Sequence, residues 1–98
     1  MKRSNPDRTL YVVAYDIPSD RRRRKVHKTL CGFGQWTQYS LFECYLTKKE
    51  RLTLGGRLDR LLEPEEDSVR FYPLCTACVD RVETVGSEAP EEELVFIV

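Results

Sequence analysis

Short runs of β-branched and aromatic residues alternate with charged stretches along the chain. Their composition and length are typical of strands, which we predict at about 9–15, 36–46, 68–75 and 78–85. A tight turn at Thr76–Ala77 is expected to join the last two. Pro73 indicates that the third strand lies at a sheet edge or contains a bulge, because proline cannot donate a ladder hydrogen bond.

Two stretches show the spacing of helices that bury one side. The apolar stripe of the first, over about 20–33, consists of Val26, Leu30 and Phe33. The apolar stripe of the second consists of Leu54, Leu58, Leu61 and Leu62. Ser19 and Thr47 precede these helices as N-caps, and Glu50 completes a capping box with Thr47. We therefore predict two amphipathic helices packed on a sheet.

The predicted elements fit an α+β fold of the ferredoxin-like type, βαββαβ, with two helices on one face of an antiparallel sheet. The chain has 98 residues, which suits a single domain over 1–98 with a modest core. The polar N-terminus, 1–8, and an acidic loop at about 86–93 are expected to be flexible. The apolar run 94–98 has no obvious place in a four-stranded sheet. We predict that it exchanges onto the sheet edge of a second copy in a homodimer.

The net charge is zero but unevenly divided. Residues 1–60 hold 14 Lys/Arg and 6 Asp/Glu, whereas residues 61–98 hold 2 Arg and 10 Asp/Glu. The basic half is expected to face nucleic acid, the two halves to pair within the fold or between subunits, or both at once. No apolar run approaches the roughly 20 residues of a membrane span, and no signal peptide is recognisable, so a cytoplasmic protein without membrane contact is expected.

The strongest candidate chemistry lies at the end of the first strand. Asp16 follows that strand directly, and the next helix opens with a run of cations. Cations oppose the helix dipole at this end, so the run favours an anion site rather than helix stability. Asp16 beside it is a candidate ligand of a divalent cation, and a second copy would supply the second carboxylate. The alternative is a turn aspartate beside a solvated helix surface.

The arginine run divides by the helical period. Arg22 and Arg23 continue the apolar stripe toward the N-terminus, so we expect them over the strand rim near Asp16. The cations expected to face outward are Arg21, Arg24 and Lys28. His27 lies two helical turns from the N-terminus and is not proposed as a base.

Four cysteines are present, Cys31, Cys44, Cys75 and Cys78. The spacing of Cys75 and Cys78 fits half of a zinc site, but the second half is missing, so we predict reduced thiols. A redox pair is disfavoured because this motif follows a strand and is not expected to open a clear helix.

Several segments together resemble a known family. They are YVVAYDIPSDRRRRKVHKTLCGFG, QYSLFE, SVRFYPLC and CVDRVETVG, which cover most of residues 9–86. The sequence resembles the small CRISPR-associated adaptation proteins of the "Cas two" family. The resemblance implies a ferredoxin-like homodimer that holds Mg²⁺ or another divalent cation between two copies of Asp16. It places nuclease roles on Asp16, Tyr15, Arg23, Lys25 and Phe42. Some relatives carry an arginine where this chain has Trp36.

Two functions follow from these observations. The first is a metal-dependent endonuclease of spacer acquisition that cleaves RNA or DNA phosphodiester bonds. The second is a non-catalytic homodimeric scaffold that binds duplex DNA and bridges the "Cas one" integrase. In both, the residues expected to contact nucleic-acid phosphates are Arg21, Arg22, Arg24 and Lys28.

Overall fold

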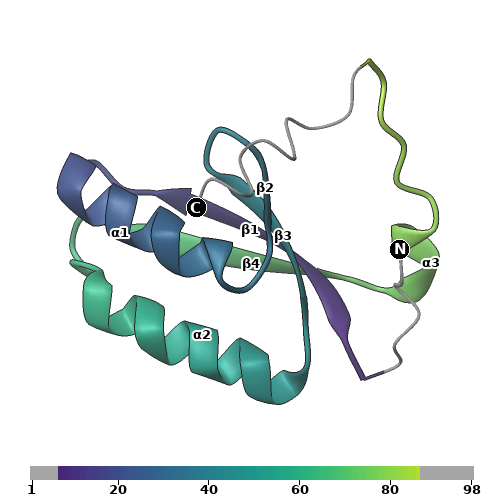
Figure 1. The fold of residues 1–98 in the computed structure, drawn as a ribbon, viewed down its shortest axis with the longest axis horizontal. Helices are drawn as coiled ribbons and strands as arrows, with labels where there is room; N and C mark the ends of the chain where they lie inside the picture. The colour runs from purple at the N-terminus through teal and green to yellow at the C-terminus, as the bar shows by residue number, and fades with distance from the viewer. Residues whose placement is uncertain (1–6, 87–98) are drawn as a thin grey trace.

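The structure is a computed structural model that describes residues 7–86. Its elements are β1 (Thr9–Asp16), α1 (Asp20–Cys31), β2 (Gln35–Gln38), β3 (Leu41–Leu46), α2 (Lys48–Leu61), β4 (Ser68–Leu74) and α3 (Thr76–Val79). The strands form one antiparallel sheet in the order β2-β3-β1-β4. Both long helices lie on the same side of this sheet (Figure 1). The predicted ferredoxin-like arrangement is therefore confirmed.

The core lies between the sheet and the two long helices. Its largest fully buried side chains are Phe42, Leu30, Leu54, Val13, Val26 and Cys44. Strand residues of one parity face this core, whereas their neighbours face the side of the sheet that carries no helix. Burying a single such apolar side chain contributes roughly 1.5–3 kcal/mol, so the predicted helical stripes do most to hold α1 and α2 on the sheet.

Both predicted helix caps are present. The Ser19 hydroxyl accepts a hydrogen bond from the Arg22 amide at 3.2 Å. Thr47 and Glu50 bond each other's backbone amides in the capping box, at 3.1 and 2.8 Å. No helix among residues 7–86 is long and apolar enough to cross a membrane.

The prediction of a single long strand over 36–46 is wrong. This segment is a hairpin, β2 and β3, and the chain reverses at Tyr39, whose φ of 43° is left-handed. The indole Nε1 of Trp36 donates to the Tyr39 carbonyl at 2.8 Å and fixes this turn. The sequence here carries no glycine, and the alternating pattern on both sides conceals the reversal.

The predicted turn at Thr76–Ala77 and strand over 78–85 are also wrong. Residues Thr76–Val79 form the short helix α3, and residues 80–86 contain no helix or strand. The Val79 and Asp80 amides donate to the Cys75 and Thr76 carbonyls at 3.0 and 3.1 Å, so local bonds replace ladder bonds here. The predicted strands and helices, taken in chain order, read βαβαββ; the βαββαβ order is present because the hairpin places two strands between α1 and α2 and no strand follows β4 in residues 7–86. The predicted terminal strand, 94–98, lies outside the described residues.

Candidate active site

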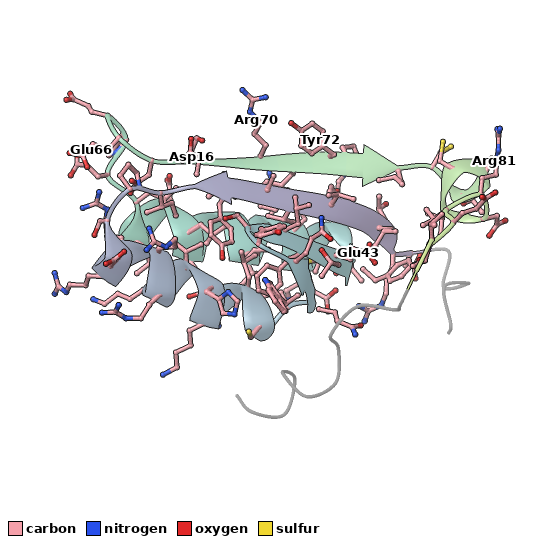
Figure 2. All side chains as sticks on the ribbon, turned by 90° about the horizontal axis from the view of Figure 1, so that it is seen from above. Asp16, Glu43, Glu66, Arg70, Tyr72 and Arg81 are labelled. Atoms are coloured by element: carbon pink, nitrogen blue, oxygen red, sulfur yellow. The ribbon has the colours of Figure 1, made fainter. Side chains whose placement is uncertain are left out.

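Asp16 is the last residue of β1 and is exposed. Its Cα partner in β4 is Ser68, and Ala14 pairs with Arg70. Paired residues share a face, so Asp16, Ser68 and Arg70 lie together on the side without helices. Figure 2 shows Asp16, Arg70 and Tyr72 on that side of the sheet. The structure therefore places the predicted carboxylate at an accessible rim, with Arg70 on the same face two residues further along β4 than Ser68, the partner of Asp16.

Sequence reasoning did not single out Arg70 or Tyr72. The Arg70 guanidinium donates to the Tyr72 hydroxyl at 3.3 Å, and this bond raises the pKa of Arg70. The alternation in SVRFY is the signal that could have found them, because Val69 and Phe71 pack against the core and the residues that alternate with them, Arg70 and Tyr72, face outward. The register between β1 and β4, which sets how far Arg70 lies from Asp16, cannot be read from the sequence pattern.

Tyr15 and Phe42 lie on the opposite face from Asp16. Tyr15 is 8% exposed and Phe42 is fully buried, and their ring centroids are 6.4 Å apart. Successive strand residues point to opposite faces, so the Tyr15 side chain points into the core, away from the open face that carries Asp16. These two predicted catalytic residues belong to the core that supports the site.

His27 joins this buried aromatic group. Its Nδ1 lies 3.2 Å from the Tyr15 hydroxyl, and its ring centroid lies 5.0 Å from that of Phe42. Burial lowers the pKa of His27 and raises the pKa of Tyr15, although the Arg23 charge opposes the latter shift. Both groups are therefore neutral near pH 7 and form a bond that ties α1 to β1.

Arg22 is engaged in an ion pair inside the chain. Its Nε donates to Asp67 at 2.7 Å, and its Nη2 donates to Glu66 at 2.8 Å. The Asp67 side chain is fully buried, and its bond with Arg22 lowers its pKa. This pair joins the start of α1 to the loop before Ser68. The Arg22 guanidinium, which was predicted to contact phosphates, therefore binds Asp67 and Glu66 and holds the loop that precedes Ser68.

Arg23 holds the loop that follows Asp16. Its Nη1 donates to the carbonyls of Ile17 and Pro18 at 2.9 and 3.4 Å, and its Nη2 pairs with Asp20. The expectation that Arg23 lies near the strand rim agrees with these bonds. Its contacts to the loop backbone make Arg23 a positioning group for Asp16.

The remaining predicted cations of α1 face solvent. They are Arg21, Arg24, Lys25 and Lys28. These cations belong to α1, in the helix layer (Figure 1), whereas Asp16 lies on the other side of the sheet (Figure 2). The cations of α1 and Asp16 therefore belong to two different surfaces of the chain.

Metal-ligand clusters are absent from the described part of the chain, where no three His, Cys, Asp or Glu residues gather. Cys75 and Cys78 are exposed free thiols, and Cys44 is buried with its pKa raised to about 12 by burial. The expectation that Cys75 does not open a helix is wrong, because it is the N-cap residue of α3. A zinc site would need four ligands, and this pair offers two.

Comparison with known proteins identifies the family. The sequence model for CRISPR associated protein Cas2 matches residues 9–82. A Synechocystis protein named CRISPR-associated endoribonuclease Cas2 3 is 51% identical over 79% of this chain and 84% of its own length. The crystal structure of Streptococcus pyogenes Cas2 at pH 6.5 has a TM-score of 0.69 and 35% identity, covering 79% of this chain and 99% of that one. A chain of a partial Cas6-RT-Cas1–Cas2 complex shares the fold, with a TM-score of 0.69, 20% identity, and coverage of 86% and 92%.

These likenesses confirm the predicted resemblance to a nuclease-named family of CRISPR-associated proteins. The matched region runs from β1 through α3 and contains Asp16, Arg70 and the cations of α1. The chain belongs to the CRISPR-associated protein Cas2 family.

Proposed function

We propose that this chain is a cytoplasmic endonuclease of CRISPR spacer acquisition that cleaves phosphodiester bonds at the Asp16 end of the sheet. The observation that carries the proposal is the exposed Asp16 carboxylate on the open face, beside Arg70. Relatives named as endoribonucleases support it. RNA and DNA both contain phosphodiester bonds, so the Asp16 carboxylate and the Arg70 guanidinium could act on either.

A divalent cation, in the first instance Mg²⁺, fits Asp16 only with help from outside one chain. Asp16 offers a single carboxylate, and the described residues hold no acidic cluster around it. Mg²⁺ in such sites is held by one or two carboxylates together with substrate phosphates and water. The Asp16 carboxylate of a second copy would complete the set. When bound, the metal polarises the phosphate and lowers the pKa of coordinated water.

Other residues of the chain would bind the phosphates and hold Asp16 in position. Arg70 faces the same side as Asp16 and would bind a non-bridging phosphate oxygen, where its positive charge offsets charge that develops during cleavage. Arg23 and the Arg22–Asp67 pair hold the two loops that flank Asp16. Lys25 and its exposed neighbours on α1 would attract the phosphate backbone without reading sequence.

A homodimer is part of this proposal. The open face of the sheet carries apolar side chains at the same parity as Asp16, including Leu10, Val12 and Ala14. Glu43, Arg70 and Tyr72 share this face, so it offers a second copy both apolar and charged contacts, and β4 is an available sheet edge. A second copy related by a two-fold axis would cover this face with the same face, which brings the two Asp16 residues toward one another.

The test is a cleavage assay with Mg²⁺ on RNA and on duplex DNA. We compare wild type with Asp16→Asn and Asp16→Ala, and use Asp59→Asn, an exposed aspartate of α2, as the matched control. Loss of cleavage in both Asp16 variants, with an unchanged dimer mass and melting temperature, is the expected result. Unchanged cleavage by Asp16→Asn would contradict the proposed site.

A non-catalytic scaffold is the second candidate, because the exposed cations belong to α1, on the helix side of the sheet, whereas Asp16 lies on the open face, and these cations can bind duplex DNA without it. In this function the homodimer would bridge the "Cas one" integrase during spacer integration. Its signature is duplex binding by Asp16→Asn equal to wild type, with no cleavage by either protein. The affinity would fall with salt in proportion to the number of phosphates contacted, a slope of about −0.9 per phosphate.

A further inference from the structure

The turn between β2 and β3 presents an aromatic ring to solvent in a strained conformation. Tyr39 is 84% exposed and has a φ of 43°, a region that tyrosine rarely occupies. The Trp36 indole donates to the Tyr39 carbonyl at 2.8 Å, and the Thr37 hydroxyl donates to the Leu41 carbonyl at 3.1 Å. The surrounding side chains therefore maintain a costly backbone conformation whose ring gains no burial in return.

This turn lies at the same end of the sheet as Asp16. The Tyr15 amide donates to the Ser40 carbonyl at 3.1 Å, so the residue after Tyr39 is bonded to the residue before Asp16. Asp16 ends β1, and Tyr39 stands beside that end in the neighbouring hairpin. A nucleotide whose phosphate lies at Asp16 would have its own base, or the next one, near this ring.

The surroundings of Tyr39 suit a nucleobase better than a protein partner. Its neighbours Gln38 and Ser40 are polar, and Gln38 is exposed. The other large exposed apolar residues among 7–86 lie on other segments, namely Leu52, Tyr72, Val82 and Val85. Protein-binding patches are contiguous and apolar at their centre, whereas one exposed aromatic ring among polar groups is a typical base-stacking platform.

We propose that Tyr39 stacks on an unpaired base of the nucleic acid bound at Asp16. This inference rests on the proposed function and adds the substrate class to it. Paired bases inside a duplex already have both faces stacked on their neighbours, so Tyr39 can engage only a base that is single-stranded or locally unpaired. The substrate it favours is therefore single-stranded RNA or DNA, or a duplex with an unpaired stretch.

The first experiment measures binding without cleavage. Anisotropy of a labelled single-stranded oligonucleotide and of a matched duplex is recorded for wild type and variants with Ca²⁺ in place of Mg²⁺, on oligonucleotides verified to stay uncleaved. Tyr39→Gly removes the ring at a φ that glycine adopts freely, Tyr39→Phe keeps the ring, and Leu52→Ala removes an exposed apolar side chain elsewhere. Melting temperature and dimer mass are checked for each.

Loss of one base–aromatic contact should weaken single-strand binding by Tyr39→Gly about ten-fold. Tyr39→Phe and Leu52→Ala should bind as wild type does, and duplex binding should be the same in all four proteins. Trp36 is the chain's single tryptophan, so its fluorescence should change on single-strand binding to wild type. An equal loss for single strand and duplex, or no loss, would overturn the inference, and so would a change of dimer mass in Tyr39→Gly, which would indicate a protein contact.

These outcomes are separable from those of the proposed function. Binding is measured on uncleaved oligonucleotide, so the Tyr39 result stands or falls whether or not Asp16→Asn abolishes cleavage. Conversely, a wild-type protein that cleaves through Asp16 but binds single strands unchanged in Tyr39→Gly would retain its proposed function and refute the stacking role.

Discussion

The family resemblance implies a nuclease role for Phe42, and substitution of this residue can distinguish a catalytic from a structural role. Its side chain is fully buried between α1 and the sheet, with its ring centroid 5.0 Å from that of His27 and 6.4 Å from that of Tyr15. No substrate atom can reach it in a folded chain. We therefore predict that replacing Phe42 impairs cleavage only by unfolding the protein.

The size of the effect follows from burial. A buried phenylalanine removes roughly 150–250 Å² from water, which at about 25 cal/mol per Å² is about 4–6 kcal/mol as an upper estimate. Phe→Ala changes in cores cost about 3–5 kcal/mol, and volume-conserving exchanges usually cost less than about 1.5 kcal/mol. Phe42→Ala should thus remove a large part of the roughly 5–15 kcal/mol that stabilises a domain, whereas Phe42→Leu should leave it folded.

The assay combines stability with activity. Urea unfolding followed by circular dichroism gives the folded fraction of wild type, Phe42→Leu and Phe42→Ala, and cleavage is then expressed per folded molecule. Leu30→Ala is the matched control, because Leu30 is equally buried but belongs to α1. All folded fractions should cleave at the wild-type rate within about two-fold, since every variant leaves Asp16 in place. A folded Phe42→Leu that cleaves far more slowly than folded Leu30→Ala would refute the reasoning.

Two further predictions concern stability. The pKa of Asp67 is lowered by its bond with Arg22, so the pair stabilises the fold above the ordinary carboxylate pKa of about 4. The advantage of wild type over Asp67→Asn in free energy of unfolding should therefore shrink as pH falls through the lowered pKa, and a difference independent of pH would contradict this. Gly34→Ala should destabilise by about 1–3 kcal/mol, because its Cβ would collide with Cys44 and the β3 backbone. In the same urea titrations Gly56→Ala, where a Cβ meets nothing within 4 Å, should stabilise the helix slightly, and equal losses in both would count against the clash.

Local sequence signals were sufficient where an element depends on its own residues. The caps at Ser19 and Thr47 follow from spacing and are present. Of the predicted apolar stripes, Val26, Leu30, Leu54 and Leu58 are buried, whereas Phe33 and Leu62 lie just beyond the ends of α1 and α2 and, like Leu61, are partly buried. The βα junction that displays Asp16 follows in the same way, because the strand ends at Asp16, two residues before Pro18, and the helix starts after Ser19. These features need no contact distant in sequence.

Prediction from local sequence patterns failed where the structure depends on contacts between residues distant in the sequence. The hairpin turn depends on the Trp36 indole bond to the Tyr39 carbonyl, which no turn residue in the sequence announces. Arg22 was expected to serve phosphates, but Asp67, 45 positions later, captures its guanidinium. That choice between solvent and an internal partner depends on the register of β4 beside β1, which periodicity alone does not give.

The placement of the carboxylate at residue 16 reconciles the dimer with the site. Val12 and Ala14 share its face but lie further inside the sheet, where a covering second copy would exclude water from them. Asp16 is the last residue of the strand, so the same cover would leave it at the border, open to a phosphate. A carboxylate at position 12 would lie opposite Glu43, its partner in β3, and under the same cover the two like charges would repel each other. The strand end is therefore the place where this face can both hold a second copy and keep a charged group available for chemistry.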